Sequence, residues 1–356
     1  MPLATRLDDV RIRHVRPLIS PALLQDDYPA DPAVQAFVER SREQVARIVH
    51  GADPRLLVVV GPCSIHDREQ AIEYARRLHA LAPQLEQDLM LVMRVYFEKP
   101  RTTVGWKGFI NDPHLDGTFR MNEGLRLARS LLLEITRMGV PAGTEFLDLL
   151  SPQYVADLVS WGAIGARTTE SPSHRQLASG LSCPIGFKNG TGGGVQMAAD
   201  ALVACRSPHA FMGMTKMGQA AIFETAGNED CHIILRGGSR GPNYHPADID
   251  AARAILHKSG VCERVMVDCS HANAAKNYLR QIEVAHELAG RISGGEQRIL
   301  GLMIESHLKP GKQELKPGVQ PEYGVSITDG CLGWEQTVAV LREVAVAARQ
   351  RRQASA

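Results

Sequence analysis

Short apolar runs recur along the chain, and stretches with helical spacing separate them. The first run extends from Leu56 to Val60 without a polar break, and Gly61-Pro62 ends it. A run of this kind is typical of a strand that is buried on both faces of a sheet. The full set of predicted strands covers residues 56–60, 89–94, 140–145, 163–167, 183–188, 231–236, 264–268 and 299–305.

Amphipathic helices are predicted between these strands. Val34 begins a helix whose apolar face is suited to closing the bottom of a barrel. Asp67 can cap the helix after the first strand, and the last helix starts at Trp334. Strand-helix-strand units build parallel sheets. Eight strands in this alternation favour an α/β fold of the (β/α)8 TIM-barrel type, with a doubly wound sheet as the alternative that strand count alone allows.

Two segments fall outside this alternation. Residues 209–224 place two short apolar stretches on either side of a loop that contains Gly218, which predicts an inserted antiparallel hairpin. Residues 1–33 are polar, contain several prolines and lack the pattern of an independent domain. They are predicted to form an N-terminal arm, either frayed or docked on another subunit, ahead of a single barrel domain over residues 34–356.

Composition argues against several classes of function. Forty Lys+Arg and thirty-nine Asp+Glu give a net charge of +1 with no long run of one sign, so neither a nucleic-acid nor a membrane surface is expected. No stretch approaches the roughly 20 apolar residues of a membrane span. The seven cysteines are odd in number and contain no CxxC pair, which argues against a disulfide framework and favours a reducing cytoplasm.

Reactive or charged side chains stand at the carboxyl ends of nearly all the predicted strands. In a (β/α)8 barrel these ends meet at one mouth, so that residues far apart in the sequence share a site. A single arginine after a strand is more often a solvated surface residue, but four cationic residues in such positions are hard to assign to chance. The strand-end residues are Cys63, Arg94, Glu145, Arg167, Lys188, Arg236, Asp268 with His271 close behind, and Glu305.

Ligand preference divides these residues into two groups. The arginines and the lysine suit a phosphorylated, carboxylated anion, because guanidinium offers forked donors to oxyanions and lysine adds a movable charge. A thiol, an imidazole and carboxylates together suit a divalent transition metal. The candidate metal ligands are Cys63, His271, Glu305 and the later Asp329. Each has a structural alternative: a core thiol, a hydrogen-bonded core histidine, a salt-bridged carboxylate and a turn residue, respectively.

Seven segments carry a specific set of motifs: VGPCSIHD over 60–67, MRVYFEKPRTT over 93–103, GARTTES over 165–171, GFKNGT over 186–191, ILRGG over 234–238, DCSHAN over 268–273 and SITD over 326–329. Together they resemble the 3-deoxy-D-arabino-heptulosonate 7-phosphate (DAHP) synthase family, in its type I, feedback-regulated microbial class. The resemblance extends from Asp8-Asp9 to the last helix.

The resemblance implies a transferase that catalyses the first step of the shikimate pathway of aromatic amino acid biosynthesis. Phosphoenolpyruvate (PEP) and D-erythrose 4-phosphate would condense with water to DAHP and phosphate. One divalent metal ion (Mn²⁺, Fe²⁺, Co²⁺ or Zn²⁺) would be bound by Cys63, His271, Glu305 and Asp329. The implied PEP-binding residues are Arg94, Arg167, Lys188 and Arg236, and those on the erythrose 4-phosphate side are Lys99, Arg101 and Thr102. The implied catalytic residues are Lys99, Glu145, Lys188 and His271, and the candidate bases for water are Glu145, His271 and Asp329.

The family also binds an aromatic amino acid inhibitor near the hairpin, in a homodimer or homotetramer. The matching positions are Pro152, Gln153, Ser182, Phe211, Gly213 and Phe223, with Asp8 and Asp9 supplied by a neighbouring subunit. Phenylalanine-sensitive relatives tend to carry serine at the position of Gly213, and tyrosine-sensitive relatives tend to carry glycine. Tyrosine is therefore the favoured inhibitor, with phenylalanine and tryptophan as alternatives.

Three other functions are weighed against this one. The same barrel type could join PEP to arabinose 5-phosphate, but the Lys-Pro-Arg-Thr motif and the hairpin insertion disfavour that reaction. A catalytically inactive sensor of aromatic amino acids is disfavoured because all four metal ligands and the basic residues are present. A nicotinamide-dependent enzyme is disfavoured because no strand is followed by the required glycine motif.

Overall fold

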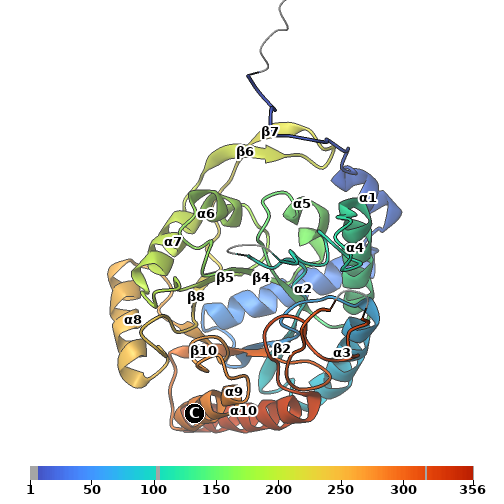
Figure 1. Cartoon of the computed structure of the whole chain (residues 1–356). Helices are drawn as coiled ribbons and strands as arrows, with labels where there is room; N and C mark the ends of the chain where they lie inside the picture. The colour runs from blue at the N-terminus through green and yellow to red at the C-terminus, as the bar shows by residue number, and fades with distance from the viewer. Residues whose placement is uncertain (1–6, 102–104, 317–318, 356) are drawn as a thin grey trace, which may run out of the picture.

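Eight parallel strands close into a barrel in the computed structural model, which describes residues 7–101, 105–316 and 319–355 (Figure 1). Their order around the barrel is β1-β10-β9-β8-β5-β4-β3-β2. The predicted (β/α)8 fold is therefore confirmed. The barrel strands are β1 (Leu56–Gly61), β2 (Leu89–Arg94), β3 (Ala142–Glu145), β4 (Trp161–Ile164), β5 (Ile185–Lys188), β8 (Cys231–Leu235), β9 (Val265–Asp268) and β10 (Ile299–Glu305).

Helices surround the barrel (Figure 1). The longer ones are α2 (Pro32–Val49), α3 (Arg68–Leu81), α4 (Met121–Arg137), α6 (Pro172–Ser179), α7 (Gln196–Arg206), α8 (Pro246–Lys258), α9 (Arg280–Ser293) and α10 (Trp334–Ser355). The shorter ones are α1 (Pro21–Asp27), α5 (Pro152–Val155) and the 3-10 turns η1 (Ala82–Gln84) and η2 (Ala156–Leu158). Among the described residues, no helix has the length and apolar character needed to cross a bilayer.

Strand residues alternate between an outer and an inner apolar cluster, because successive side chains of a strand point to opposite faces. In β1, Val58 packs in the cluster that contains the surrounding helices, whereas Leu57 and Val59 belong to the cluster inside the barrel. The inner cluster also contains Val45 and Ile48 of α2. Helix α2 thus closes the bottom of the barrel, as its apolar spacing predicts, and leaves the carboxyl ends of the strands open.

Strand β4 differs from its predicted bounds of 163–167. It begins at Trp161, whose fully buried side chain packs inside the barrel and donates from Nε1 to His232 Nε2 at 3.0 Å. It ends at Ile164, because Thr168 N and Thr169 N both bond back to Gly165 O and close a turn. Arg167 therefore lies in an exposed turn rather than at a strand end.

The inserted segment forms the antiparallel pair β6 (Ala210–Met214) and β7 (Ala220–Glu224), outside the barrel and at the top of Figure 1. The N-terminal segment meets it, since Ala22 N donates to Lys216 O at 2.7 Å. Ile19 N also donates to Asn122 Oδ1 of α4 at 2.8 Å, whereas residues 7–18 are all exposed. The division into an arm over 1–33 and a barrel domain over 34–356 stays a prediction.

Strands β1 and β10 approach each other closely at one glycine. Leu57 pairs with Gly301, and a Cβ added to Gly301 would lie 1.9 Å from the main-chain oxygen of Leu57. The register of β10 against β9 also shifts between Ile299 and Gly301. Gly301 therefore sets the spacing of the two strands whose carboxyl ends lead to Cys63 and Glu305.

We expect Gly301→Ala to lower the free energy of unfolding by about 3 kcal/mol, because the added methyl group must push β1 away from β10. The matched control is Gly290→Ala in α9, where an added Cβ meets no atom within 4 Å. That change should stabilise the protein by about 0.5–1 kcal/mol. Urea unfolding followed by circular dichroism measures both, and equal midpoints for the two variants would contradict the prediction.

Candidate active site

Three of the four predicted metal ligands come together at the carboxyl ends of the barrel strands. The Sγ of Cys63 and one carboxylate oxygen each of Glu305 and Asp329 all lie within 4.8 Å of one another. Cys63 and Glu305 are fully buried, and Asp329 is exposed. The fourth predicted ligand, His271, follows β9 and places Nε2 4.0 Å from Glu305 Oε1. The side chains thus reach one place from β1, β9, β10 and the loop before α10.

The chemistry of these side chains fits a divalent transition metal. Burial, and next the charge of Glu305, raise the pKa of Cys63 to about 11, so the free thiol keeps its proton at neutral pH. A thiolate in this place needs a cation to replace that proton. One soft sulfur ligand with carboxylate and imidazole donors is a set that suits Mn²⁺, Fe²⁺, Co²⁺ or Zn²⁺ rather than Ca²⁺.

Asp268, the last residue of β9, contacts two of the predicted site residues. Its Oδ2 lies 2.9 Å from Lys188 Nζ and 2.9 Å from His271 Nδ1. Burial alone would raise the pKa of Asp268, but the charges of Lys188 and His271 outweigh that effect and hold the pKa well below its usual value. The sequence places Asp268 at a strand end without assigning it a role. Its spacing of three residues from His271 is the signal that could have found it.

The turn after β9 fixes the direction of the imidazole. His271 has a left-handed backbone conformation (φ 56°), and Asn273 holds the turn by donating from Nδ2 to Asp268 O at 2.8 Å. Ser270 Oγ donates to Glu305 Oε2 at 2.7 Å. This short segment therefore supports two predicted metal ligands, His271 and Glu305, at the same time.

Glu305 is held as an anion by its neighbours. Burial would raise its pKa, but the charges of His271, Arg94 and Lys99 lower the pKa to about 2. Arg94 donates from Nη2 to Glu305 Oε1 at 3.2 Å, and its guanidinium carbon lies 4.0 Å from the ring centre of Tyr96. Arg94 Nη1 is buried and has no hydrogen-bond partner among the described residues. A buried unpaired donor of this kind is available to an anion.

Lys99 lies against the thiol. Its Nζ donates to Cys63 Sγ at 3.1 Å and to Cys63 O at 3.0 Å. Glu98, the preceding residue, is buried and accepts from Ser151 Oγ at 2.8 Å. Burial raises the pKa of Glu98 to about 7. Glu98 is not among the residues predicted for the site, because nothing in the sequence pattern marks it as buried.

The remaining predicted residues lie at or above the mouth. Glu145 is buried at the end of β3, and its Oε1 would lie 2.2 Å from a Cβ added to Gly165, so a side chain at Gly165 would displace the Glu145 carboxylate. Arg236 is half-buried, and its pKa is lowered by burial first and also by the charge of Arg167. Arg167 and Arg101 are exposed and donate to main-chain oxygens of Pro100 and Trp106. Thr102 lies outside the described residues.

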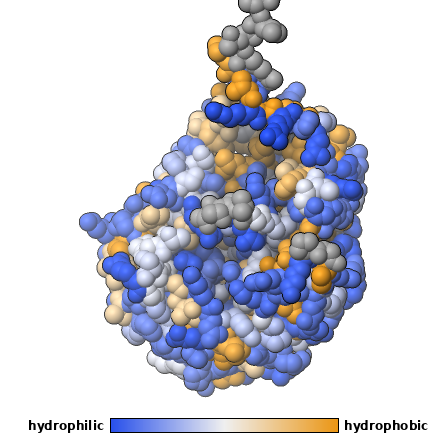
Figure 2. Space-filling model, viewed as in Figure 1, coloured by the Kyte–Doolittle hydropathy of each residue, from blue (hydrophilic) through white to orange (hydrophobic). Residues whose placement is uncertain are grey.

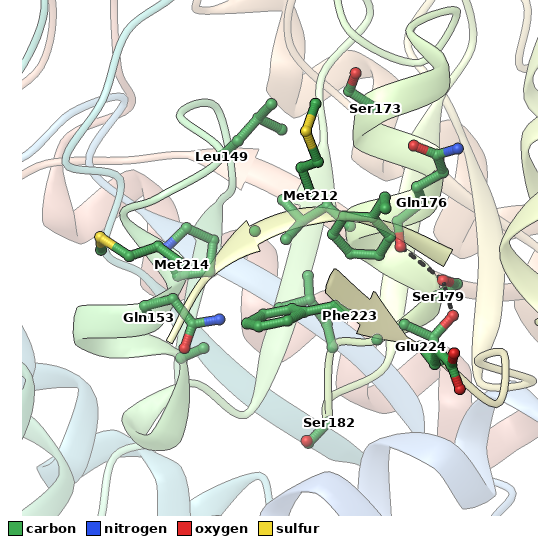
Figure 3. Close-up of a pocket in the computed structure, with 18 of the residues that line it drawn as sticks. Leu149, Gln153, Ser173, Gln176, Ser179, Ser182, Met212, Met214, Phe223 and Glu224 are labelled. Carbon is green, nitrogen blue, oxygen red and sulfur yellow. Dashed lines mark hydrogen bonds between the residues drawn. The ribbon is translucent and has the colours of Figure 1, made fainter. Parts of the chain in front are cut away.

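A cavity of about 1340 Å³ lies between the hairpin and the α5 and α6 region (Figure 3). Apolar residues gather around the hairpin in Figure 2, and the rings of Phe211 and Phe223 meet edge to face at 6.0 Å. Of the predicted inhibitor-site residues, Pro152, Gln153, Ser182, Phe211, Gly213 and Phe223 all line this cavity. Asp8 and Asp9 are exposed and are not among its lining residues.

Comparisons with known proteins agree with these motifs. Residues 33–342 match the model of the DAHP synthetase I family. The chain is 54% identical over 345 residues to the Phe-sensitive phospho-2-dehydro-3-deoxyheptonate aldolase of Escherichia coli K12, covering 97% of this chain and 98% of that one. It is 52% identical over 339 residues to the Tyr-sensitive enzyme of the same organism, covering 95% of each.

A solved structure gives the same result. The phospho-2-dehydro-3-deoxyheptonate aldolase of Francisella tularensis SCHU S4 superposes with a TM-score of 0.93 at 49% identity, covering 96% of this chain and 99% of that one. The match includes nearly the whole barrel and its extensions, so it is not confined to a shared fold. The chain therefore belongs to the DAHP synthetase I family.

Proposed function

We propose that the chain condenses PEP with D-erythrose 4-phosphate and water to DAHP and phosphate, as a transferase at the start of aromatic amino acid biosynthesis. The observation that carries the proposal is the group of Cys63, Glu305 and Asp329 within 4.8 Å, with His271 facing it. Cationic residues surround this group, which supports anionic substrates. The relatives are named phospho-2-dehydro-3-deoxyheptonate aldolases, which supports a reaction of the aldol type.

One divalent metal ion would be held by Cys63, His271, Glu305 and Asp329. When bound, it supplies a Lewis acid that polarises the aldehyde oxygen of erythrose 4-phosphate. The acidic residues suit this task, because the pKa of Glu305 is lowered and its carboxylate remains charged at neutral pH. The exposure of Asp329 gives the ion a route of entry from solvent.

The basic residues would bring two negatively charged substrates together. Lys188 and Arg94 are buried at the mouth, and Arg236 is half-buried beside them. Their charges would hold the phosphate and carboxylate of PEP, with Arg167 at the rim. Lys99, Arg101 and Thr102 would bind erythrose 4-phosphate. Fixing both substrates replaces a costly encounter by a near-attack geometry.

Carbon–carbon bond formation from the vinyl carbon of PEP leaves positive character at C2 of PEP. Water must add there before phosphate leaves, and a residue at the mouth must take its proton. Glu145, His271 and Asp329 are the candidates for this base. Of the three, Glu145 is buried at the end of β3, His271 contacts Asp268, and Asp329 is exposed.

The cavity beside the hairpin would bind an aromatic amino acid as a feedback inhibitor, and tyrosine is favoured. A Cβ added to Gly213 would lie 3.0 Å from Phe223 Cδ2, so a side chain at this position would require the Phe223 ring to shift. We also propose a homodimer or homotetramer in which the arm of residues 1–33, with Asp8 and Asp9, completes this site on a neighbouring subunit. The protein would act in the cytoplasm.

The central assay mixes purified protein with PEP, erythrose 4-phosphate and Mn²⁺ and follows the loss of PEP. We expect turnover that a chelator abolishes and added Mn²⁺ restores, because the polarising ion is then removed and returned. Arabinose 5-phosphate in place of erythrose 4-phosphate is the control for substrate choice. Chelator-insensitive turnover, or a preference for arabinose 5-phosphate, would refute the proposal.

Cys63→Ala should lose bound metal and activity while it keeps the fold, because β1 is stabilised by its apolar side chains and not by the thiol. The matched control is Cys205→Ala, which removes another fully buried thiol far from the mouth, in α7. Metal content by mass spectrometry and unfolding midpoints measure both properties. A Cys63→Ala protein that is active and fully loaded with metal would contradict the assignment of Cys63 as a metal ligand.

Inhibition assays with tyrosine, phenylalanine and tryptophan test the regulatory proposal. We expect tyrosine to inhibit most strongly, and Gly213→Ser to weaken its effect because the new side chain displaces the Phe223 ring. Ala220→Ser, on the exposed part of β7 and outside the cavity lining, is the control. Inhibition by phenylalanine with no effect of tyrosine would overturn the choice of inhibitor.

A further inference from the structure

One carboxylate oxygen at the mouth serves two different partners. Asp268 Oδ2 lies 2.9 Å from Lys188 Nζ, which extends from the end of β5, and 2.9 Å from His271 Nδ1. The other oxygen, Oδ1, accepts from Ser270 N at 3.0 Å. Because Oδ1 is bound to the main chain, Asp268 cannot turn to give each partner an oxygen of its own. Lys188 donates a hydrogen bond to Oδ2, whereas His271 Nδ1 lies at ion-pair distance from the same oxygen and has no hydrogen-bond partner among the described residues. Lys188 and His271 therefore compete for one oxygen.

Burial strengthens the contacts of Asp268 with Lys188 and His271. Asp268 is fully buried, and Lys188 is 5% exposed. Ion pairs in such surroundings are screened little by solvent, so a change in one contact alters the strength of the other. The turn that carries His271 is fixed from below by Asn273, which donates to Leu235 O at 3.0 Å and to Asp268 O at 2.8 Å.

We propose that Asp268 is a positioning residue that couples binding of the divalent metal ion to binding of PEP. The inference rests on the proposed function, in which His271 binds the metal through Nε2 and Lys188 binds PEP. When Lys188 turns part of its charge toward PEP, Asp268 Oδ2 is left to His271 Nδ1. A carboxylate that accepts from one nitrogen of an imidazole makes the other nitrogen a stronger metal ligand.

The coupling has a definite sign. PEP should tighten metal binding, and by linkage the metal should tighten PEP binding by the same factor. Direct attraction between the cation and the anionic substrate adds to this effect and does not depend on Asp268. A substitution of Asp268 removes only the part of the coupling between metal and PEP binding that depends on its carboxylate.

The experiment measures the affinity of the purified protein for Mn²⁺ from the electron paramagnetic resonance signal of the free ion, with and without saturating PEP. Erythrose 4-phosphate is left out, so no turnover occurs. We expect PEP to raise the Mn²⁺ affinity of the wild type about tenfold. For Asp268→Asn we expect Mn²⁺ affinity to fall about 10–100-fold. In this variant, PEP should raise the Mn²⁺ affinity by only about threefold or less; we call this increase the gain from PEP.

Ser270→Ala is the matched control. It removes the 2.7 Å bond from Ser270 Oγ to Glu305 but keeps the main-chain bond to Asp268. It should weaken Mn²⁺ binding while the gain from PEP stays at the wild-type value. Complexes between Mn²⁺ and PEP in solution affect all variants equally, so they cancel in the comparison of the gains.

Each outcome has one meaning. A gain from PEP that is the same in Asp268→Asn as in the wild type overturns the coupling but leaves the proposed function intact. Wild-type protein that binds neither Mn²⁺ nor PEP contradicts the proposed function itself. If circular dichroism shows that Asp268→Asn does not fold, Lys188→Gln asks the same question, with PEP raised until it saturates the variant because Lys188 also binds PEP in the proposed function. In Lys188→Gln the Asp268 carboxylate contacts His271 whether or not PEP is bound. The increase in Mn²⁺ affinity on adding PEP should therefore be smaller in this variant too.

Discussion

The pairing of buried charges at the carboxyl ends of the barrel strands determines the arrangement of the mouth. Glu305 and Asp268 are fully buried, and each lies within 3.2 Å of a buried cation, Arg94 or Lys188. Removing one partner of such a pair costs about 3–5 kcal/mol, because the other charge stays buried and unpaired. The ion pairs that offset the free-energy cost of burying these charges also fix the side chains before any ligand binds.

The barrel supplies the distances that this pairing needs. Cys63 follows β1 and Glu305 ends the neighbouring strand β10, and the close contact of Gly301 with Leu57 sets how near those strands lie. The packed interior, which α2 closes from below, resists a shift of the strands relative to one another. The distances between the polar side chains at the mouth therefore depend on apolar packing several residues away.

The sequence predicts those features that depend on local pattern. The unbroken run from Leu56 to Val60 is enough to identify β1, and Gly61-Pro62 its end. Strand β4 was misplaced because Trp161 is buried by contacts across the barrel, including the bond to His232, which no local pattern records. For the same reason the contacts between side chains of different strands, such as Lys99 with Cys63, could not be predicted.

The charges at the mouth explain why these residues fit a metal ion together with an anionic substrate. Asp268 and Glu305 remain ionised and already neutralise much of the charge of the buried cations. An anion entering the mouth competes with these carboxylates for Lys188 and Arg94. A divalent cation at Cys63, Glu305 and Asp329 would add the positive charge that such competition requires. The proposed metal and substrate would therefore depend on each other electrostatically, and Asp268 lies between the residues proposed to bind them.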